Sequence, residues 1–123
     1  TFIAVAEAKA VEKVPEKKIP VKNRITITGT STRDIWLGKL VKCESGGRPE
    51  AINPKDRDNT PSYGLLQFKP TTFDMYKKRY NIEGFMMDPQ AQIKIVRRMM
   101  DDPKVIWKNE FPDCVSKLGY PPK

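Results

Sequence analysis

Glu44 is the residue of this sequence whose position best suits acid–base chemistry. It lies at the end of a predicted helix, immediately before Ser45-Gly-Gly47, where the negative end of the helix dipole disfavours a carboxylate. The apolar residues Tyr63, Leu65 and Phe68, if folded against it, would disfavour ionisation further by desolvation. A glutamate held protonated near neutral pH can act as a general acid. An exposed helix-end glutamate without function is the alternative, and position alone favours that alternative.

The composition excludes several other kinds of site. The 123 residues contain no His and two Cys, which excludes His-dependent nucleophiles, His-ligated zinc and a four-cysteine zinc site. Neither GxGxxG nor GxxxxGK occurs, so nothing indicates a dinucleotide or nucleoside triphosphate site. The sequence therefore predicts no cofactor and no metal site, and it leaves carboxylates as the leading groups for acid–base work.

The charge balance favours a polyanionic partner. There are 23 Lys and Arg against 15 Asp and Glu, a net charge of +8. Nucleic acid, an anionic membrane surface and the bacterial cell wall all fit such a charge. Nucleic acid ranks last because the sequence has no recognisable binding motif for it, and we expect no nucleic-acid partner.

Helix signals begin at Ser31. Ser31-Thr-Arg-Asp34 fits a capping box, in which the Ser hydroxyl and the Asp carboxylate satisfy free backbone N–H groups. Gly46-Gly47 supplies the stop for this helix. The apolar residues between them recur at helical spacing and are Trp36, Leu37, Leu40 and Val41.

Three more helices are predicted after a proline-containing loop over residues 48–62. One begins near Pro70 and ends at about Tyr80. The next begins at Asp88-Pro89, an N-cap followed by proline at the first helical position, and Asp102-Pro103 repeats this signal for a last helix through Trp107. Residues 25–28 alternate at period two, as a short strand would. Ile95, Val96, Met99 and Met100 share one side of the third predicted helix. Trp36, Met99, Met100 and Trp107 are expected in the core, and a sugar-stacking platform is the alternative for Trp107.

Cys43 and Cys114 lie near opposite ends of this helical region. In a secreted protein such a pair indicates one disulfide. It would close a loop of about 70 residues and contribute roughly 4 kcal/mol. Two buried thiols in a cytosolic protein are the alternative, and the spacing alone does not choose between them.

Several short motifs around Glu44 occur in a specific order and spacing. They are Cys43-Glu-Ser-Gly-Gly47, Ala51-Ile-Asn53, Ser62-Tyr-Gly-Leu-Leu-Gln-Phe68, Thr72-Phe73, Gln92-Ile93, and Trp107 shortly before Cys114. Over residues 33–118 the chain resembles the lysozyme-like superfamily, and within it lytic transglycosylases and resuscitation-promoting factors. It departs from those factors in residues 63–67, where they usually have a second Gly, and in a longer loop between Asn53 and Ser62.

The resemblance implies a fold and a set of site residues. The fold is α+β but mainly α, a small lysozyme-like domain of several short helices with a long loop or a minimal hairpin. It also implies a Cys43–Cys114 disulfide, and Glu44 as the single catalytic acid and base. The residues expected to bind substrate are Ser45, Asn53, Ser62, Tyr63, Gln67, Phe68 and Thr72.

The implied reaction is cleavage of the β-1,4 bond between N-acetylmuramic acid and N-acetylglucosamine in peptidoglycan. Glu44 would protonate the leaving oxygen and then, as a base, activate the muramic 6-hydroxyl, which gives a 1,6-anhydro product. Asp56 and Asp58 are interpreted as solvated loop acids. Either one can instead position a water, as in a hydrolytic lysozyme. A non-catalytic wall-binding module is a further alternative, against which the presence of Glu44 argues.

Residues 1–30 are expected to form an extended, basic linker of Lys, Glu and Pro, and residues 31–123 the lysozyme-like domain. The chain begins at Thr1 without Met, so we expect an upstream segment to have been removed. The apolar run over residues 2–6 is interpreted as the tail of a signal peptide or of an upstream membrane anchor, although the basic start of such a segment is absent. We therefore expect an extracytoplasmic protein, secreted or tethered to the cell surface. We expect it to be a monomer whose partners are peptidoglycan glycan strands.

Overall fold

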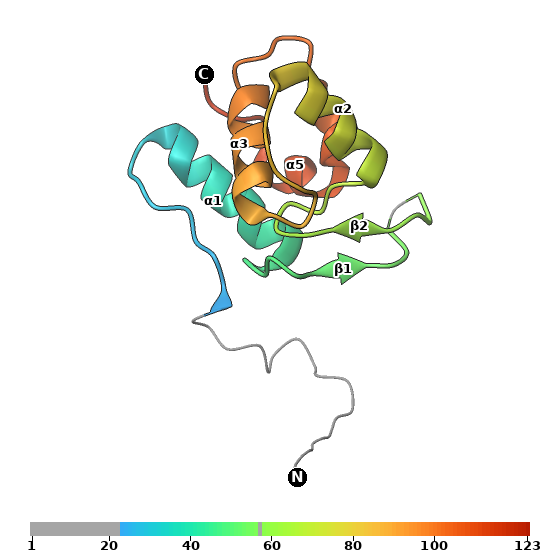
Figure 1. Cartoon of the computed structure of the whole chain (residues 1–123). Coiled ribbons are helices and arrows are strands. Elements are labelled where there is room, and N and C mark those ends of the chain that lie inside the picture. Colours follow the sequence, from blue (N-terminus) through green and yellow to red (C-terminus); the bar gives the residue numbers. More distant parts are fainter. Residues whose placement is uncertain (1–22, 57) are drawn as a thin grey trace.

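The computed structural model describes residues 23–56 and 58–123 (Figure 1). The mainly helical fold expected from the sequence is confirmed, and the predicted long loop contains a minimal hairpin. The expected signal or anchor segment, and residues 1–22 of the expected linker, lie outside the described residues. The elements found are α1 (Thr32–Ser45), β1 (Ile52–Asn53), β2 (Ser62–Tyr63), α2 (Pro70–Tyr80), α3 (Pro89–Met99), α4 (Trp107–Glu110) and α5 (Pro112–Leu118).

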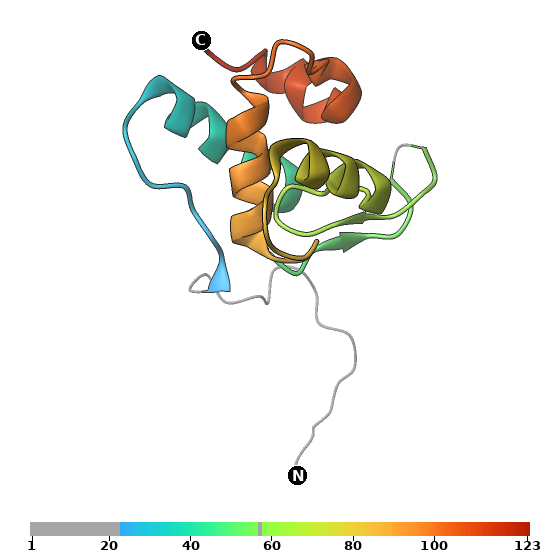
Figure 2. The ribbon, with the colours of Figure 1, turned by 45° about the horizontal axis from the view of Figure 1, so that its top comes forward.

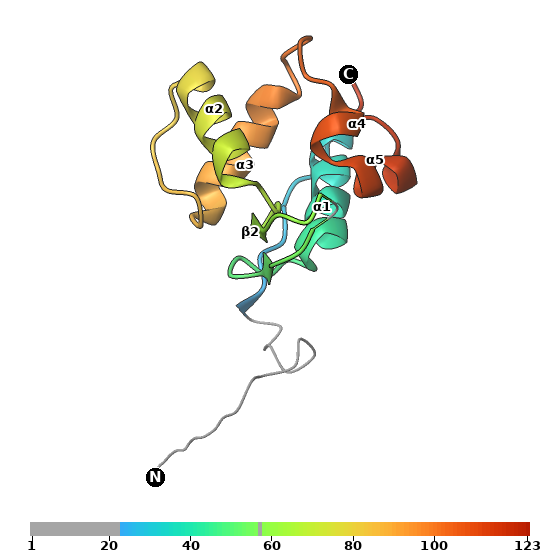
Figure 3. The same ribbon diagram turned by 90° about the vertical axis from the view of Figure 1, so that its right-hand side faces the viewer.

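The helices form two groups, which Figure 3 separates clearly. α2 packs beside α3, whereas α1 packs beside α5, which directly follows α4. Figures 1 and 2 both place α3 between α1 and α2. The antiparallel hairpin follows α1, with Ile52 opposite Tyr63 and Asn53 opposite Ser62. The last turn of α1, the hairpin and α5 therefore converge on one side of the domain.

The ends of α1 are set by local chemistry. The Ser31 hydroxyl accepts a hydrogen bond from the Asp34 amide at 3.0 Å, as the capping-box prediction required. Gly46 has a left-handed φ of 68°, and its amide donates to the Lys42 carbonyl at 2.9 Å. This conformation suits glycine because glycine has no Cβ. The helix stop predicted from the sequence is therefore confirmed.

The core lies between the two helix groups and includes the apolar face predicted for α1. Leu37 and Leu40 are fully buried, and each such side chain contributes roughly 1.5–3 kcal/mol through burial. Trp36 and Trp107 meet edge to face with ring centroids 5.3 Å apart. Trp107 is thus a core residue, as expected. Met99 is also buried, while Met100 is half-buried against the same cluster.

Two predicted elements are wrong. Asp102-Pro103 does not begin a helix: the Asp102 carboxylate accepts from the Lys104 amide at 3.0 Å and closes only a turn. The other Asp102 oxygen is held by the Tyr80 hydroxyl at 2.6 Å, so the next helix begins only at Trp107.

Residues 25–28 form no strand in the described structure. The Ile25 amide donates to the Gly47 carbonyl at 2.7 Å, in the turn after α1, where no strand edge is available. Ile25 and Ile27 pack, partly buried, against the core cluster.

Among the described residues, no helix has both the length and the apolar character that a membrane span requires.

Candidate functional site

A cleft of about 620 Å³ opens where the end of α1, the hairpin, the first turn of α2 and the α4–α5 corner meet. Charged and polar groups from all four segments line it together with two aromatic rings. The lining residues are Cys43, Glu44, Asn53, Asp56, Asp58, Ser62, Gln67, Phe68, Lys69, Thr72, Asn109, Glu110, Phe111, Pro112, Asp113, Cys114 and Lys117.

Glu44 lies in the last turn of α1, and the residues after it hold that turn in place. The buried Ser45 hydroxyl donates to the Val41 carbonyl at 3.4 Å and accepts from the Gly47 and Arg48 amides, both at 3.2 Å. The Arg48 guanidinium donates to the Ser45 carbonyl at 2.8 Å. These contacts satisfy groups that a helix end leaves open. The Glu44 side chain therefore projects from a fixed backbone.

The Glu44 carboxyl is half-buried and strongly perturbed. Burial is the largest cause, and the negative charges of Asp56 and Asp113 act in the same direction, so that its pKa is raised to about 8. No hydrogen bond or ion pair to this carboxyl is found within the described ranges. Because both loss of solvation and like charge favour the neutral form, Glu44 is mostly protonated at pH 7 and can donate a proton.

The two loop acids have partners of their own. The Ser62 hydroxyl donates to Asp56 at 2.5 Å. Asp58 accepts from the Thr60 hydroxyl and pairs with Lys69 at 2.9 Å, and hydrogen bonds from these two residues lower its pKa to about 2. Both carboxylates line the cleft, so the interpretation of Asp56 and Asp58 as merely solvated acids is incomplete.

Gln67 follows the hairpin and is presented to the cleft from an unusual backbone conformation. Its φ is 53°, in the left-handed region. Its side-chain Nε2 donates to the carbonyls of Ala51 and Gly64 at 3.1 and 2.9 Å. The amide nitrogen is thereby occupied, and Oε1 is the polar atom left to accept a hydrogen bond from a ligand.

The structure brings most of the sequence-predicted site residues together. Six of the eight predicted catalytic and binding residues line the cleft: Glu44, Asn53, Ser62, Gln67, Phe68 and Thr72. Ser45 is buried behind the cleft, where it holds the helix end. Tyr63 is not among the lining residues and pairs across the hairpin with Ile52. Leu65, one of the apolar residues expected against Glu44, is fully buried in the core.

One wall of the cleft was not anticipated. Residues 109–113 and Lys117 line it, and the Glu110 carboxylate there accepts from the Tyr76 hydroxyl at 2.8 Å. The available signal was the Cys43–Cys114 pair: a disulfide to the residue before Glu44 must place the neighbours of Cys114 beside Glu44. Phe111 is part of this wall, and the centroid of its ring lies 5.9 Å from that of Phe68.

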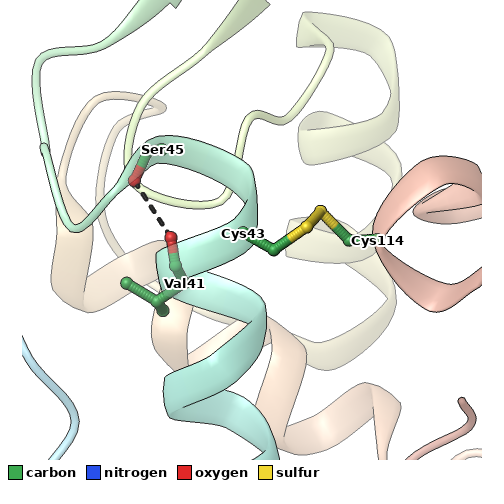
Figure 4. Close-up of a disulfide and its surroundings, with 4 residues drawn as sticks. All are labelled: Val41, Cys43, Ser45 and Cys114. Atoms are coloured by element: carbon green, nitrogen blue, oxygen red, sulfur yellow. Dashed lines mark hydrogen bonds between the residues drawn. A yellow bond between two sulfur atoms is a disulfide. The ribbon is translucent and has the colours of Figure 1, made fainter. Parts of the chain in front are cut away.

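The disulfide joins the last turn of α1 to α5, as Figure 4 shows. The Cα atoms of Cys43 and Cys114 are 5.9 Å apart, which confirms the predicted pairing. Cys43 is adjacent in sequence to Glu44, and Cys114 is adjacent to Asp113. The disulfide therefore holds the residues that carry these two cleft carboxyl groups close to each other. Within the described ranges, no three His, Cys, Asp or Glu side chains are grouped so that they could hold a metal ion.

The chain is related to a known protein family. The model of the transglycosylase SLT domain matches residues 33–114, which is more than half of the sequence. The chain belongs to this family. No curated protein and no solved structure matches the chain significantly.

Membership of the SLT family indicates what the domain acts on. An SLT transglycosylase domain implies a peptidoglycan substrate and cleavage of its glycan strands. The disulfide and a peptidoglycan-acting domain together indicate an extracytoplasmic location, because disulfides persist in oxidising compartments. The region matched to the SLT model begins in the first turn of α1 and ends at Cys114, so it contains the cleft except for Lys117.

Proposed function

We propose that this SLT domain cleaves the β-1,4 bond between N-acetylmuramic acid and N-acetylglucosamine, with Glu44 as general acid and then base. The observation that supports this most is the placement of Glu44, with its pKa raised by burial and by neighbouring acids, in a cleft with polar and aromatic walls. Family membership supplies the substrate. A single carboxyl that is neutral at pH 7 is what protonation of a glycosidic oxygen requires.

In the proposed reaction, the Glu44 proton passes to the leaving oxygen as the bond to the muramic C1 breaks. The muramic 6-hydroxyl oxygen then bonds to C1, and its proton passes to the Glu44 carboxylate. The enzyme returns to its protonated state, no water is consumed, and the product is a 1,6-anhydro sugar. The environment suits both steps, because the burial and the charges that raise the Glu44 pKa also make its carboxylate a stronger base.

The product mass tests this reaction directly. We expect purified peptidoglycan digested by the domain in ¹⁸O-labelled water to yield muropeptides that are one water lighter than hydrolysed ones and contain no label. Labelled reducing ends would overturn the lyase assignment. If a correctly folded preparation released no muropeptides at all, the domain would be a non-catalytic wall-binding module.

One observation favours hydrolysis as the second candidate. Asp56 lines the same cleft as Glu44 and lies near enough to raise the pKa of its carboxyl. A second carboxylate in such a position can hold a hydrolytic water. The hydrogen bond from Ser62 also gives Asp56 a structural role. Because the lyase reaction needs only the Glu44 carboxyl, we expect Asp56→Asn to keep turnover if the lyase proposal is right.

The pH dependence gives a further prediction for the same residues. We expect kcat/KM to fall as pH rises through about 8, because the Glu44 proton is lost there. Asp56→Asn should move this alkaline limb to lower pH, since removal of a like charge lowers the pKa of Glu44. Asp74→Asn is the matched control, because Asp74 is exposed on α2 and pairs with Lys78 outside the cleft. An Asp56→Asn profile that coincides with that of Asp74→Asn would contradict the prediction.

A further inference from the structure

The side chain of Gln92 on α3 has no part in the reaction proposed for the cleft. It is fully buried and does not line the cleft. The Gln92-Ile93 pair stood out in the sequence, yet the chemistry proposed for Glu44 makes no use of it. A buried amide is costly unless its donors and acceptor are satisfied, so its partners show what it does.

The Gln92 amide binds the chain just ahead of Gln67. Its Oε1 accepts from the Leu66 amide at 2.7 Å, and its Nε2 donates to the Tyr63 carbonyl at 3.0 Å. Nε2 also donates to the Met86 carbonyl at 2.6 Å. The Tyr63 carbonyl and the Leu66 amide are the two groups that an ordinary β-turn joins directly. Here the side chain of a distant helix bridges them instead.

Gly64 makes room for this bridge. A Cβ added at Gly64 would lie 2.4 Å from Gln92 Nε2, and the glycine φ is 84°. Any larger residue would therefore have to displace the amide as well as adopt a strained backbone. Gly64 and Gln92 thus form a matched pair that determines the path of the chain between Tyr63 and Phe68.

The same short segment ends at Gln67, which lines the cleft. The Gln67 backbone amide donates to the Gly64 carbonyl at 3.2 Å, and its Nε2 donates to that same carbonyl at 2.9 Å. The position of the Gln67 side-chain amide consequently depends on where the Gly64 peptide lies. That peptide lies between the two groups that Gln92 bridges.

We propose that Gln92 is a positioning residue for glycan binding, which fixes the turn over residues 63–68 so that Gln67 presents its Oε1 to the sugar. This inference rests on the proposed function, in that it takes the cleft to be the glycan site. Gln92 itself touches neither the cleft nor the reacting atoms. Its effect should therefore appear in substrate affinity and depend on the presence of Gln67.

A double-mutant cycle tests this dependence. Binding is measured as the Kd for a tetrasaccharide of alternating N-acetylglucosamine and N-acetylmuramic acid, with every variant made in a Glu44→Gln background. Turnover is measured as kcat and KM on soluble glycan strands, with the same variants made in the domain that retains Glu44. We expect Gln92→Met and Gln67→Ala each to weaken binding by about tenfold, the value of one hydrogen bond. KM should rise with little change in kcat. The double variant should bind about as weakly as Gln67→Ala alone.

Two controls keep the result interpretable. Gln90→Met makes the same change at an exposed position of α3 and should leave Kd, kcat and KM unchanged. Gln92→Glu is the second variant if Gln92→Met does not fold, because a buried neutral Glu can accept from Leu66 but has a single donor and cannot donate to both Tyr63 and Met86. In either variant, amide hydrogen exchange at Leu66 should speed up more than exchange in α1.

The proposal is overturned if the Gln92 substitution weakens binding equally with and without Gln67, if it lowers kcat instead of raising KM, or if it changes neither. These outcomes are separable from a failure of the proposed function. That failure would appear as no product released from peptidoglycan by the unsubstituted chain, whereas the cycle is measured by binding.

Discussion

Glu44→Gln is expected to lower the rate of peptidoglycan cleavage by about 10²- to 10⁴-fold, the usual contribution of a positioned general acid or base. Gln has nearly the same shape as the protonated carboxyl but cannot donate its proton to a leaving oxygen. The Glu44 side chain is held on a fixed helix end, so the substitution should leave the cleft and its glycan affinity close to those of the unsubstituted domain. Release of muropeptides and tetrasaccharide binding measure the two properties separately.

The matched control is Glu83→Gln. Glu83 is exposed in the connection between α2 and α3 and does not line the cleft, so the same change of charge there should leave the rate unchanged. Undiminished release by Glu44→Gln would contradict the catalytic role of this residue. Loss of binding together with activity would instead indicate that Glu44 acts chiefly by holding the glycan.

Removal of the disulfide is the second change with a large expected effect. The Cys43–Cys114 bond joins positions 71 residues apart. The chain-entropy model gives about 4 kcal/mol for a loop of that length, against a total of about 5–15 kcal/mol for a typical domain. We expect the Cys43→Ala/Cys114→Ala double variant to lose this amount in urea unfolding. Activity should fall as well, because α5 supplies one wall of the cleft.

Reductant provides the control for this prediction. It should destabilise the unsubstituted domain and leave the double variant unchanged, because the sequence contains only these two cysteines. The unsubstituted domain should also change mobility between non-reducing and reducing electrophoresis, whereas the variant should not. A loss below about 1 kcal/mol in the double variant would mean that packing of α1 on α5 holds the fold without the covalent link.

Much of the fold was predictable from local sequence signals. The Ser31 cap, the Gly46 stop and the Asp88-Pro89 start each act within one helical turn, and each is found where the sequence placed it. The last helix was misplaced because Asp102-Pro103 supplies the same local signal as Asp88-Pro89. The difference is tertiary: Tyr80 and Arg79 hold the Asp102 carboxylate, and the chain turns there before α4 begins.

The residues of the site, like the helices, were predictable only in part. The family resemblance pointed to Glu44, Asn53, Gln67 and Thr72, which all line one cleft. It could not separate Ser45 and Tyr63, which lie outside the cleft, from their lining neighbours Glu44 and Ser62. Which side of a turn a residue faces depends on backbone angles such as the left-handed φ of Gln67, and residue order alone does not specify these.

The sequence by itself determined where α1, α2 and α3 lie, because helix signals act within about one turn, but it misplaced α4 and did not predict α5. Together with the family resemblance it also singled out the cysteine pair and Glu44 as the residue that can donate a proton. Only the tertiary structure decided the protonation state of that residue. The pKa of Glu44 is about 8 because folding buries its carboxyl and brings Asp56 and Asp113 near it. Those acids lie 12 and 69 positions further along the chain, and only folding brings them close enough to oppose its ionisation.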